Sequence, residues 1–333
     1  MSEHTLSISK PRHYAQALRL VDTKNMDHDQ WLAVRQQGIG GSDAAAAVGL
    51  NPYHSPLELW LEKTGRVTPA TEPEPDTDSP LYWGTVLEPI VAEQYARRKG
   101  YRVRRVNAVL QHPEHPWMLV NLDREIVGQQ DVKLLQCKTA GLNGARLWRD
   151  GVPEYVIVQV MHELAVTGYQ AADVAVLIAG QQLEIHRIER REDVIADLIA
   201  QERRFWQAVE DDVPPPPDGS ASSQQALRRL YPQDKGTTLD FRDDPERSRT
   251  FTALLDVRQQ LDELGREEAQ LKQQLQSALG EASYATFANG SISWKRTKDG
   301  SRIDVQALEQ AYPALCAHFR QTVAGSRRFV IRD

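Results

Sequence analysis

The chain has 333 residues, enough for one large domain or two modest ones, and its formal net charge is -6. No stretch reaches the ~18 consecutive apolar residues of a membrane span, and 41% hydrophobic with 26% charged residues is typical of a globular protein. The two cysteines, Cys137 and Cys316, exclude a disulfide framework and a zinc site made of four cysteines. The first 22 residues lack the apolar core of a signal peptide, so we expect a cytoplasmic protein.

Residues 27–212 alternate helical and strand patterns, and we expect one α/β domain there, behind an N-terminal extension of residues 1–26. Asp29 opens a short predicted helix, and an alanine-rich helix ends at Gly49. Capping residues and apolar spacing predict further helices at residues 55–65, 81–99 (with Pro89 inside), 153–168 and 193–209. Residues 67–80 are rich in Pro, Thr, Glu and Asp and predict an exposed loop.

Strand-like runs fall between these helices. They cover residues 101–110, 117–127, 132–139, 172–179 and 183–189. The last two predict a hairpin around residues 180–181, because Gly180 suits a tight turn. A mixed sheet flanked by helices is the expected core.

Four consecutive prolines mark residues 213–248 as a linker or extended strap, followed by a C-terminal region of residues 249–333. A heptad stripe, broken once by Glu268, predicts a long helix there; its members are Leu254, Val257, Leu261, Leu264, Leu271 and Leu275. We favour a helical hairpin within the chain over a dimer zipper. Asn289-Gly290 predicts a β-hairpin over residues 284–297, followed by a helical region over 303–319 and a last strand over 327–331.

Six basic residues occupy nine positions at the end of the predicted helix 81–99 and just beyond it: Arg97, Arg98, Lys99, Arg102, Arg104 and Arg105. Cations at the end of a helix complement its dipole, so this run is equally consistent with a solvated helix end. The alternative is a patch that faces nucleic-acid phosphates, with Arg98, Arg102 and Arg104 as candidates. The negative charge of the whole chain argues weakly against a protein that coats nucleic acid.

Asp123 and the strand that ends in Lys138 carry the most chemistry. Magnesium prefers oxygen ligands, and a lysine beside such a metal can orient or deprotonate water. Residues two apart share a face of a strand, so Gln136 and Lys138 are expected to point together toward Asp123. Cys137 would point the other way, although its carbonyl could reach a metal. Taken alone, this spacing also fits an ordinary sheet edge.

Flanking blocks give the strand its context. In chain order they are Trp31-Leu32-Ala33-Val34-Arg35, Gly38-Ile39-Gly40-Gly41-Ser42-Asp43, Asn51-Pro52-Tyr53, Leu57-Glu58-Leu59-Trp60, Trp83-Gly84-Thr85-Val86-Leu87-Glu88-Pro89, Asn121-Leu122-Asp123, Gln136-Cys137-Lys138 and Pro153-Glu154-Tyr155 with Gln159. With these blocks the sequence resembles the YqaJ viral recombinase family, relatives of lambda exonuclease within the PD-(D/E)XK nuclease superfamily. The resemblance covers about residues 27–190 and implies a restriction-endonuclease-like α/β core.

The resemblance also implies a two-metal site for Mg²⁺, which Mn²⁺ would replace. Asp123 would bind both metals, and position 136 with the carbonyl of Cys137 would complete the ligands. Lys138 would act on the attacking water, and Glu88 would reach the metals through water. Without the resemblance, Glu88 is also consistent with one charge on a solvated helix.

The same resemblance places four more residues at the substrate. Arg35 and Ser42 would grip the 5′-phosphate at an end of double-stranded DNA. Tyr155 and Gln159 lie one helical turn apart and would line the site. Arg35 could instead form a surface ion pair, Ser42 could cap a helix, and Tyr155 could belong to the core.

The function implied is a 5′→3′ exonuclease on duplex DNA that leaves 3′ overhangs for a single-strand annealing protein. Lambda-type relatives form a ring-shaped trimer, so a homo-oligomer is implied as well. A structure- or site-specific endonuclease on the same core is one alternative. A DNA-end-binding protein without catalysis is another.

Gln136 departs from the family motif, which has Glu at this position. A unit charge ~4 Å away is worth about 4 kcal/mol at an effective dielectric of ~20, and losing it from the transition state would slow the reaction about a thousandfold. Three explanations compete. The glutamine was introduced to trap substrate, or Glu125 or Asp131 supplies the missing carboxylate, or the protein only binds DNA. We favour the first, because the other site residues are intact.

Overall fold

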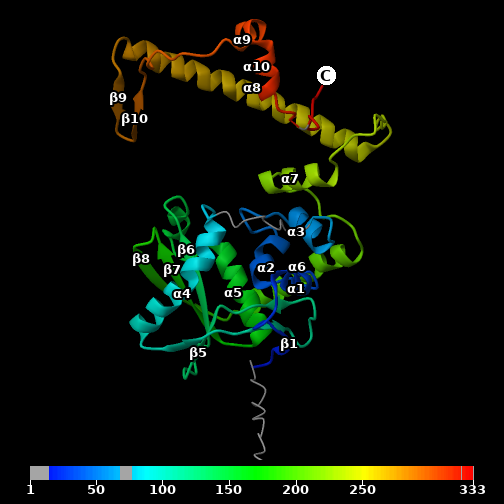
Figure 1. Cartoon of the computed structure of the whole chain (residues 1–333), viewed down its shortest axis with the longest axis vertical. Coiled ribbons are helices and arrows are strands. Elements are labelled where there is room, and N and C mark those ends of the chain that lie inside the picture. The colour runs from blue at the N-terminus through cyan, green and yellow to red at the C-terminus, as the bar shows by residue number, and fades with distance from the viewer. Residues whose placement is uncertain (1–14, 68–76, 324, 333) are drawn as a thin grey trace, which may run out of the picture. The chain divides into compact units, whose positions relative to one another are not determined.

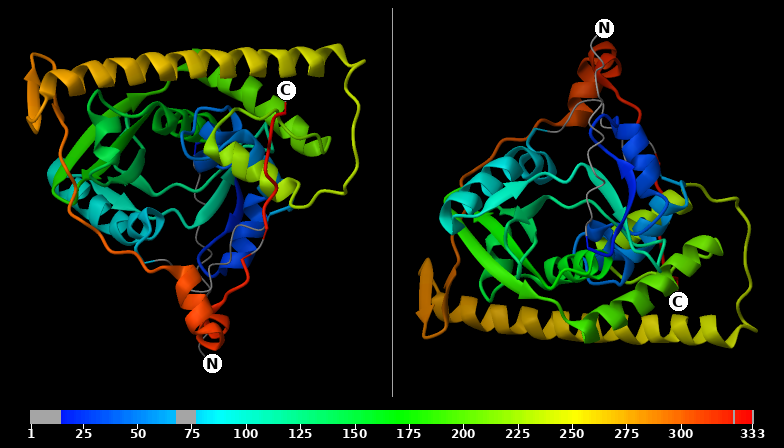
Figure 2. Two further views of the ribbon diagram at one scale, coloured as in Figure 1. Left: turned by 90° about the horizontal axis from the view of Figure 1, so that it is seen from above. Right: turned by 90° about the horizontal axis from the view of Figure 1, so that it is seen from below.

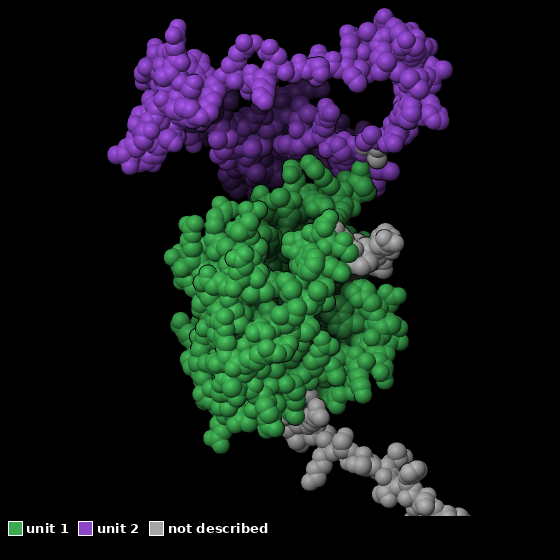
Figure 3. Space-filling model, turned by 60° about the vertical axis from the view of Figure 1, so that its left-hand side comes forward, with its two compact units in different colours: residues 1–232 green, residues 233–333 purple. Residues whose placement is uncertain are grey.

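The computed structural model describes residues 15–67, 77–323 and 325–332. Most of the loop expected at residues 67–80, and most of the N-terminal extension, lie outside this range. The chain divides into two compact units, residues 1–232 and 233–333 (Figure 3). Over the described residues, no helix is both long enough and apolar enough to cross a membrane.

The first unit is built on a five-stranded sheet (Figure 1). Its strands, in spatial order, are β2 (Arg102–Arg104), β5 (Arg124–Val127), β6 (Leu134–Ala140), β7 (Ala171–Ile178) and β8 (Gln182–Glu189). Strands β6 and β7 are parallel, and the other neighbours are antiparallel. The expected fold class, an α/β core with a central mixed sheet, is therefore confirmed, and so is the β7–β8 hairpin.

A second, three-stranded sheet corrects two of the predicted strands. It consists of β1 (Leu18–Asp22), β3 (Ala108–Gln111) and β4 (Leu119–Val120). The run predicted as one strand over 101–110 is β2 and β3, and the run over 117–127 is β4 and β5. Each run leaves one sheet and enters the other, and no Gly or Pro marks the change. Strand β1 was not predicted.

Six of the helices that the structure describes in the first unit agree with the prediction to within one or two residues at most ends. They are α1 (His28–Arg35), α2 (Gly41–Ala47), α3 (Pro56–Lys63), α4 (Pro80–Lys99), α5 (Glu154–Thr167) and α6 (Glu192–Glu210). Helices α3 and α4 both start with proline, where a missing N–H costs nothing, behind a serine cap. Helix α4 continues through Pro89. A short 3₁₀ helix, η1 (Gly144–Trp148), precedes α5.

The two faces of the five-stranded sheet are covered by different helices. Leu135 and Cys137 of β6 belong to an apolar cluster with Val91 and Tyr95 of α4. Leu134 belongs to the main core, together with the apolar side chains of α5. Side chains alternate along a strand, so the even-numbered positions of β6 face the side of α5.

Helix α5 is held in place by a buried pair. His162 has its Nδ1 2.7 Å from Oε1 of Glu202 on α6, and its Nε2 lies 3.0 Å from the carbonyl oxygen of Leu119 on β4. Both side chains of the His162–Glu202 pair are fully buried. One residue of α5 therefore ties the helix to α6 and to the three-stranded sheet.

The segment expected to be a linker or strap, residues 213–248, contains a packed helix, α7 (Ala221–Leu230). Ala226 is fully buried, and the hydroxyl of Ser222 contacts Glu58 of α3 and accepts from the backbone N–H of Ser55 at 2.8 Å. The prolines at 214–217 precede this helix, and Ser220 caps it. The proline run therefore leads into a docked helix.

The second unit is dominated by α8 (Pro245–Leu279), which Figure 2 shows as one continuous helix. It also contains the predicted hairpin, β9 (Tyr284–Phe287) and β10 (Gly290–Ser293). The helical region predicted over 303–319 is two helices, α9 (Val305–Ala311) and α10 (Pro313–Phe319), because Pro313 starts a new helix. The described residues of 327–331 form no strand, which corrects that prediction.

Candidate active site

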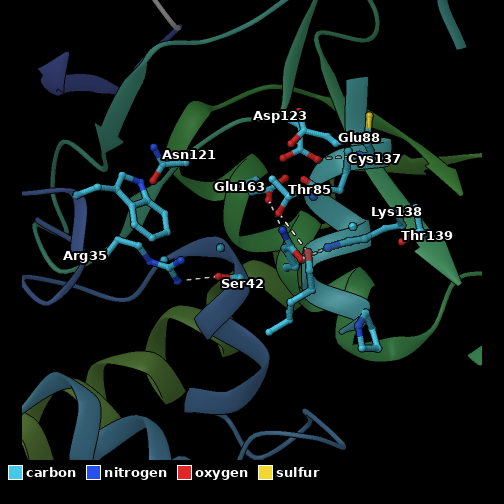
Figure 4. Close-up of a pocket in the computed structure, with 18 residues that line it drawn as sticks. Arg35, Ser42, Thr85, Glu88, Asn121, Asp123, Cys137, Lys138, Thr139 and Glu163 are labelled. Carbon is cyan, nitrogen blue, oxygen red and sulfur yellow. Dashed lines mark hydrogen bonds between the residues drawn. The ribbon is translucent and has the colours of Figure 1, made fainter. Parts of the chain in front are cut away.

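A cavity of ≈ 390 Å³ lies where β6, α4, α5 and the start of α2 meet. Figure 4 shows Asp123, Glu88 and Glu163 grouped in one part of it, with Arg35 and Ser42 in another. Gln136, Lys138 and Gln159 also line the cavity. The structure thus brings together most of the residues that the sequence singles out.

Asp123 lies between β4 and β5, at the point where the chain passes from the smaller sheet to the larger one. Its Oδ2 accepts a hydrogen bond of 2.8 Å from the backbone N–H of Cys137. Burial raises the pKa of Asp123 to about 6, and the positive charge of Lys138 opposes this shift only in part. The carboxyl group is therefore anchored to β6 while it lacks full charge compensation.

Gln136 and Lys138 both line the cavity, as the two-residue repeat of the strand predicts. Gln136 is only 3% exposed, and its Oε1 has no hydrogen-bond partner. The ammonium of Lys138 donates to Oε1 of Gln159 at 2.7 Å. Strand β6 and helix α5 are linked through this bond.

Glu163 is a cavity residue that the sequence analysis missed. It is 1% exposed, its Oε1 accepts from Nε2 of Gln159 at 2.8 Å, and its Oε2 has no partner. Burial, and then the negative charge of Asp123, raise the pKa of Glu163 to about 8. Tyr155, Gln159 and Glu163 follow at four-residue steps, so extending the predicted helical face by one turn would have found it.

Glu88 reaches the cavity from α4 and forms an ion pair with Arg124. Arg124 also donates to the carbonyl oxygen of Asp123 at 2.6 Å and is only 7% exposed in its side chain. Arg124 is not among the site residues predicted from the sequence. It joins the helix that carries Glu88 to the residue that carries the central carboxyl group.

Arg35 and Ser42 form the other part of the cavity. The guanidinium of Arg35 lies 4.8 Å from the centre of the Trp31 ring, donates to Oγ of Ser42 at 2.8 Å and pairs with Asp43. The ammonium of Lys63 lies 2.7 Å from the other Asp43 oxygen. These two cations hold the pKa of Asp43 well below its usual range against the effect of burial. Arg35 thus lines the cavity and also forms an ion pair, although its partner Asp43 is buried and not on the surface.

Several predicted residues lie elsewhere. Tyr155 does not line the cavity and meets Tyr53 edge to face, with ring centres 6.1 Å apart. Arg98 donates to the carbonyl of Leu183 at 2.7 Å, and Arg104 pairs with Glu125. Arg102, on the edge strand β2, is exposed and does not line the cavity.

Neither residue suggested as a replacement for the motif glutamate reaches the cavity. Glu125 is paired with Arg104, 2.6 Å away, and Asp131 is paired with Arg187, 2.9 Å away. The side chain of Asp131 is 66% exposed. The structure therefore does not support either as the missing carboxylate.

The donor set suits a hard divalent cation. Buried oxygen atoms without partners are costly unless water or an ion binds them, and the cavity holds two, Gln136 Oε1 and Glu163 Oε2, beside Asp123. Over the described part of the chain, no three Asp, Glu, His or Cys side chains converge closely enough to hold a metal by themselves. Amide and main-chain oxygens would thus have to contribute.

Comparisons with known proteins identify the family of this chain. A family model described as the YqaJ-like viral recombinase domain matches residues 30–170. The chain is 35% identical over 318 residues to an uncharacterized protein, YqaJ, of Bacillus subtilis (strain 168). The aligned region covers 94% of this chain and 97% of that protein. The chain belongs to the YqaJ-like viral recombinase family.

Two solved structures are similar to this family member at 20% identity. One is an alkaline exonuclease, LHK-Exo, from Laribacter hongkongensis, with a TM-score of 0.47 over 61% of this chain and 97% of that one. The other is LHK-Exo in complex with dAMP, with a TM-score of 0.45 over the same shares.

The raised pKa of Glu163 predicts how stability depends on pH in the absence of divalent metal. The folded protein keeps a proton on Glu163 up to about pH 8, whereas the unfolded chain loses it near 4.5. As the pH rises from about 4.5 to about 8, the free energy of unfolding should therefore fall. Glu163 contributes at most about 1.4 kcal/mol per pH unit to this fall. Glu163→Gln should flatten the fall. Urea unfolding in chelator over this range measures it, and parallel profiles for the two proteins would contradict the assignment.

Proposed function

We propose that this protein is a divalent-metal-dependent deoxyribonuclease that digests duplex DNA from 5′ ends and leaves 3′ overhangs. The observation that carries the proposal is the shared cavity of Asp123, Gln136, Lys138 and Glu88, with Arg35 also on its wall. Carboxylate and amide oxygens suit Mg²⁺, and a lysine lies beside them. Membership of the YqaJ-like viral recombinase family supports the same activity.

Each protein group has a defined part in this proposal. Asp123, Gln136 Oε1 and the carbonyl of Cys137 would hold Mg²⁺, or Mn²⁺ in its place, with Glu88 reaching it through water. When bound, such ions stabilise charge on the phosphate and lower the pKa of water. The Nζ of Lys138, fixed by Gln159 at 2.7 Å, orients the attacking water and stabilises the negative charge of the phosphate oxygens.

Arg35 and Ser42 are proposed to bind the phosphate at the 5′ end. The guanidinium is held by Asp43 and the Trp31 ring, so little conformational freedom is lost on binding. Lys63 is 5% exposed in its side chain and shares Asp43, so a second positive charge lies behind the first. Such a pocket favours 5′-phosphorylated over 5′-hydroxyl ends.

The wider setting follows from the same proposal. We infer action in the cytoplasm of a bacterial or phage-infected cell, on overhangs handed to a single-strand annealing protein. A ring-shaped trimer would keep the enzyme on its substrate. Arg98, Arg102 and Arg104 remain candidates for contacts with the DNA backbone away from the cavity.

Gln136 favours a second candidate, a protein that binds DNA ends without cutting them. The amide replaces a charge that the family motif supplies, and weaker metal binding follows from that loss. An endonuclease on the same core is the other alternative. Cleavage assays separate all three.

With Mg²⁺, the protein should degrade linear duplex DNA and leave covalently closed circular DNA intact, and a chelator should stop the reaction. Asp123→Asn should lower the rate at least about a thousandfold, because an anionic metal ligand is lost. Gel analysis of both substrates measures this. If neither the wild type nor Gln136→Glu cuts linear duplex, the nuclease proposal fails; cleavage of the circle would favour the endonuclease.

Arg35→Ala should weaken binding to 5′-phosphorylated ends by about 1.5–3 kcal/mol, the range of hydrogen bonds to charged groups, and leave binding to 5′-hydroxyl ends nearly unchanged. Fluorescence anisotropy with the two duplexes in chelator measures the difference. Arg191→Ala is the matched control, because Arg191 is an exposed arginine paired with Asp193 and does not line the cavity. Equal weakening for both ends would contradict an end-gripping role.

A further inference from the structure

Glu163 has no assigned role in the two-carboxylate motif, yet it shares the cavity with that motif. We propose that Glu163 supplies the metal-binding carboxylate that the family motif carries at position 136, with the amide oxygen of Gln136 kept as a neutral ligand. The inference rests on the proposed nuclease function. It moves one anionic ligand from strand β6 to helix α5.

The orientation of Glu163 supports this role. Its Oε1 is fixed by Gln159, which in turn holds Lys138, so the carboxyl group is tied to the lysine of the motif. The second oxygen, Oε2, is buried without a partner, as is Oε1 of Gln136. Glu163 and Asp123 both line the cavity that Gln136 also lines (Figure 4). Two buried acceptor atoms in one cavity point to a cation between them.

The charge balance supports the exchange as well. The family motif places two carboxylates, Asp and Glu, on the two strands, and here Gln136 removes one of them. Glu163 restores the count of carboxyl groups, since Asp123 and Glu163 together again provide two of them in the cavity that Lys138 lines. The alternatives Glu125 and Asp131 are occupied by Arg104 and Arg187.

The backbone leaves room for this carboxyl group. A Cβ atom at Gly41, the first residue of α2, would lie 2.9 Å from Oε1 of Glu163. Any larger residue would push the glutamate out of its position. Oε2 needs a partner from within the cavity, because burying a polar atom without one is unfavourable.

Mn²⁺ binding by the full-length protein, measured by titration calorimetry without DNA, tests the proposal. Glu163→Gln should lower the affinity for Mn²⁺ at least about tenfold, because even replacing a residue that only supports a metal ligand lowers metal affinity by that factor. Adding Gln136→Glu to Glu163→Gln should restore affinity to near the wild-type value. Glu125→Gln is the matched control, a buried carboxyl outside the cavity, and should bind Mn²⁺ like the wild type.

Glu163→Met is the second variant, because it fills a similar volume without a polar group and should fold at least as well. It should melt cooperatively and lose Mn²⁺ binding to the same extent. Wild-type affinity in both Glu163 variants would overturn the proposal, even if the protein cuts DNA. Loss of Mn²⁺ binding, together with no cleavage of linear duplex by the wild type or Gln136→Glu, would support the ligand and overturn the nuclease function.

Discussion

Two acidic side chains, Asp123 and Glu163, share one cavity with Lys138 beside them, and the rest of the site depends on this arrangement. Removing a carboxylate from water is costly unless an opposite charge or hydrogen bonds replace the water. Asp123 receives the Cys137 N–H, and Glu163 receives the Gln159 amide, but one Glu163 oxygen stays without a partner. A divalent cation would satisfy both groups at once.

The two-sheet architecture brings these groups together. Asp123 lies at the passage from β4 to β5, next to β6, while Glu163 comes from α5 on one face of the sheet. Helix α5 is fixed by the buried His162–Glu202 pair, and α2 approaches it so closely that a Cβ atom at Gly41 would lie 2.9 Å from Oε1 of Glu163. The site therefore needs the fold of the whole first unit, since its parts come from segments far apart in the sequence.

The sequence predicted the elements with strong local patterns: the helices with caps and stops, the β7–β8 hairpin, and the shared face of Gln136 and Lys138. It did not predict where a strand changes sheets, because no Gly or Pro lies between β2 and β3 or between β4 and β5. Helix α7 was not predicted because it follows the proline run, and its docking depends on tertiary contacts such as those of Ser222 with Ser55 and Glu58. Glu163 was missed because a single acid in an apolar helix acquires meaning only from its neighbours in space.

Whether Glu163 binds the metal can be tested by proton release when Mn²⁺ binds, measured by calorimetry at pH 7 in buffers of different ionisation enthalpy. At this pH Glu163, with a pKa of about 8, still holds its proton, and a cation must displace it. If Glu163 binds the metal, the protein should release close to one proton per molecule, and the Glu163→Gln variant should release far less than one. Binding without proton release, or no binding of Mn²⁺ at all, would contradict this role of Glu163.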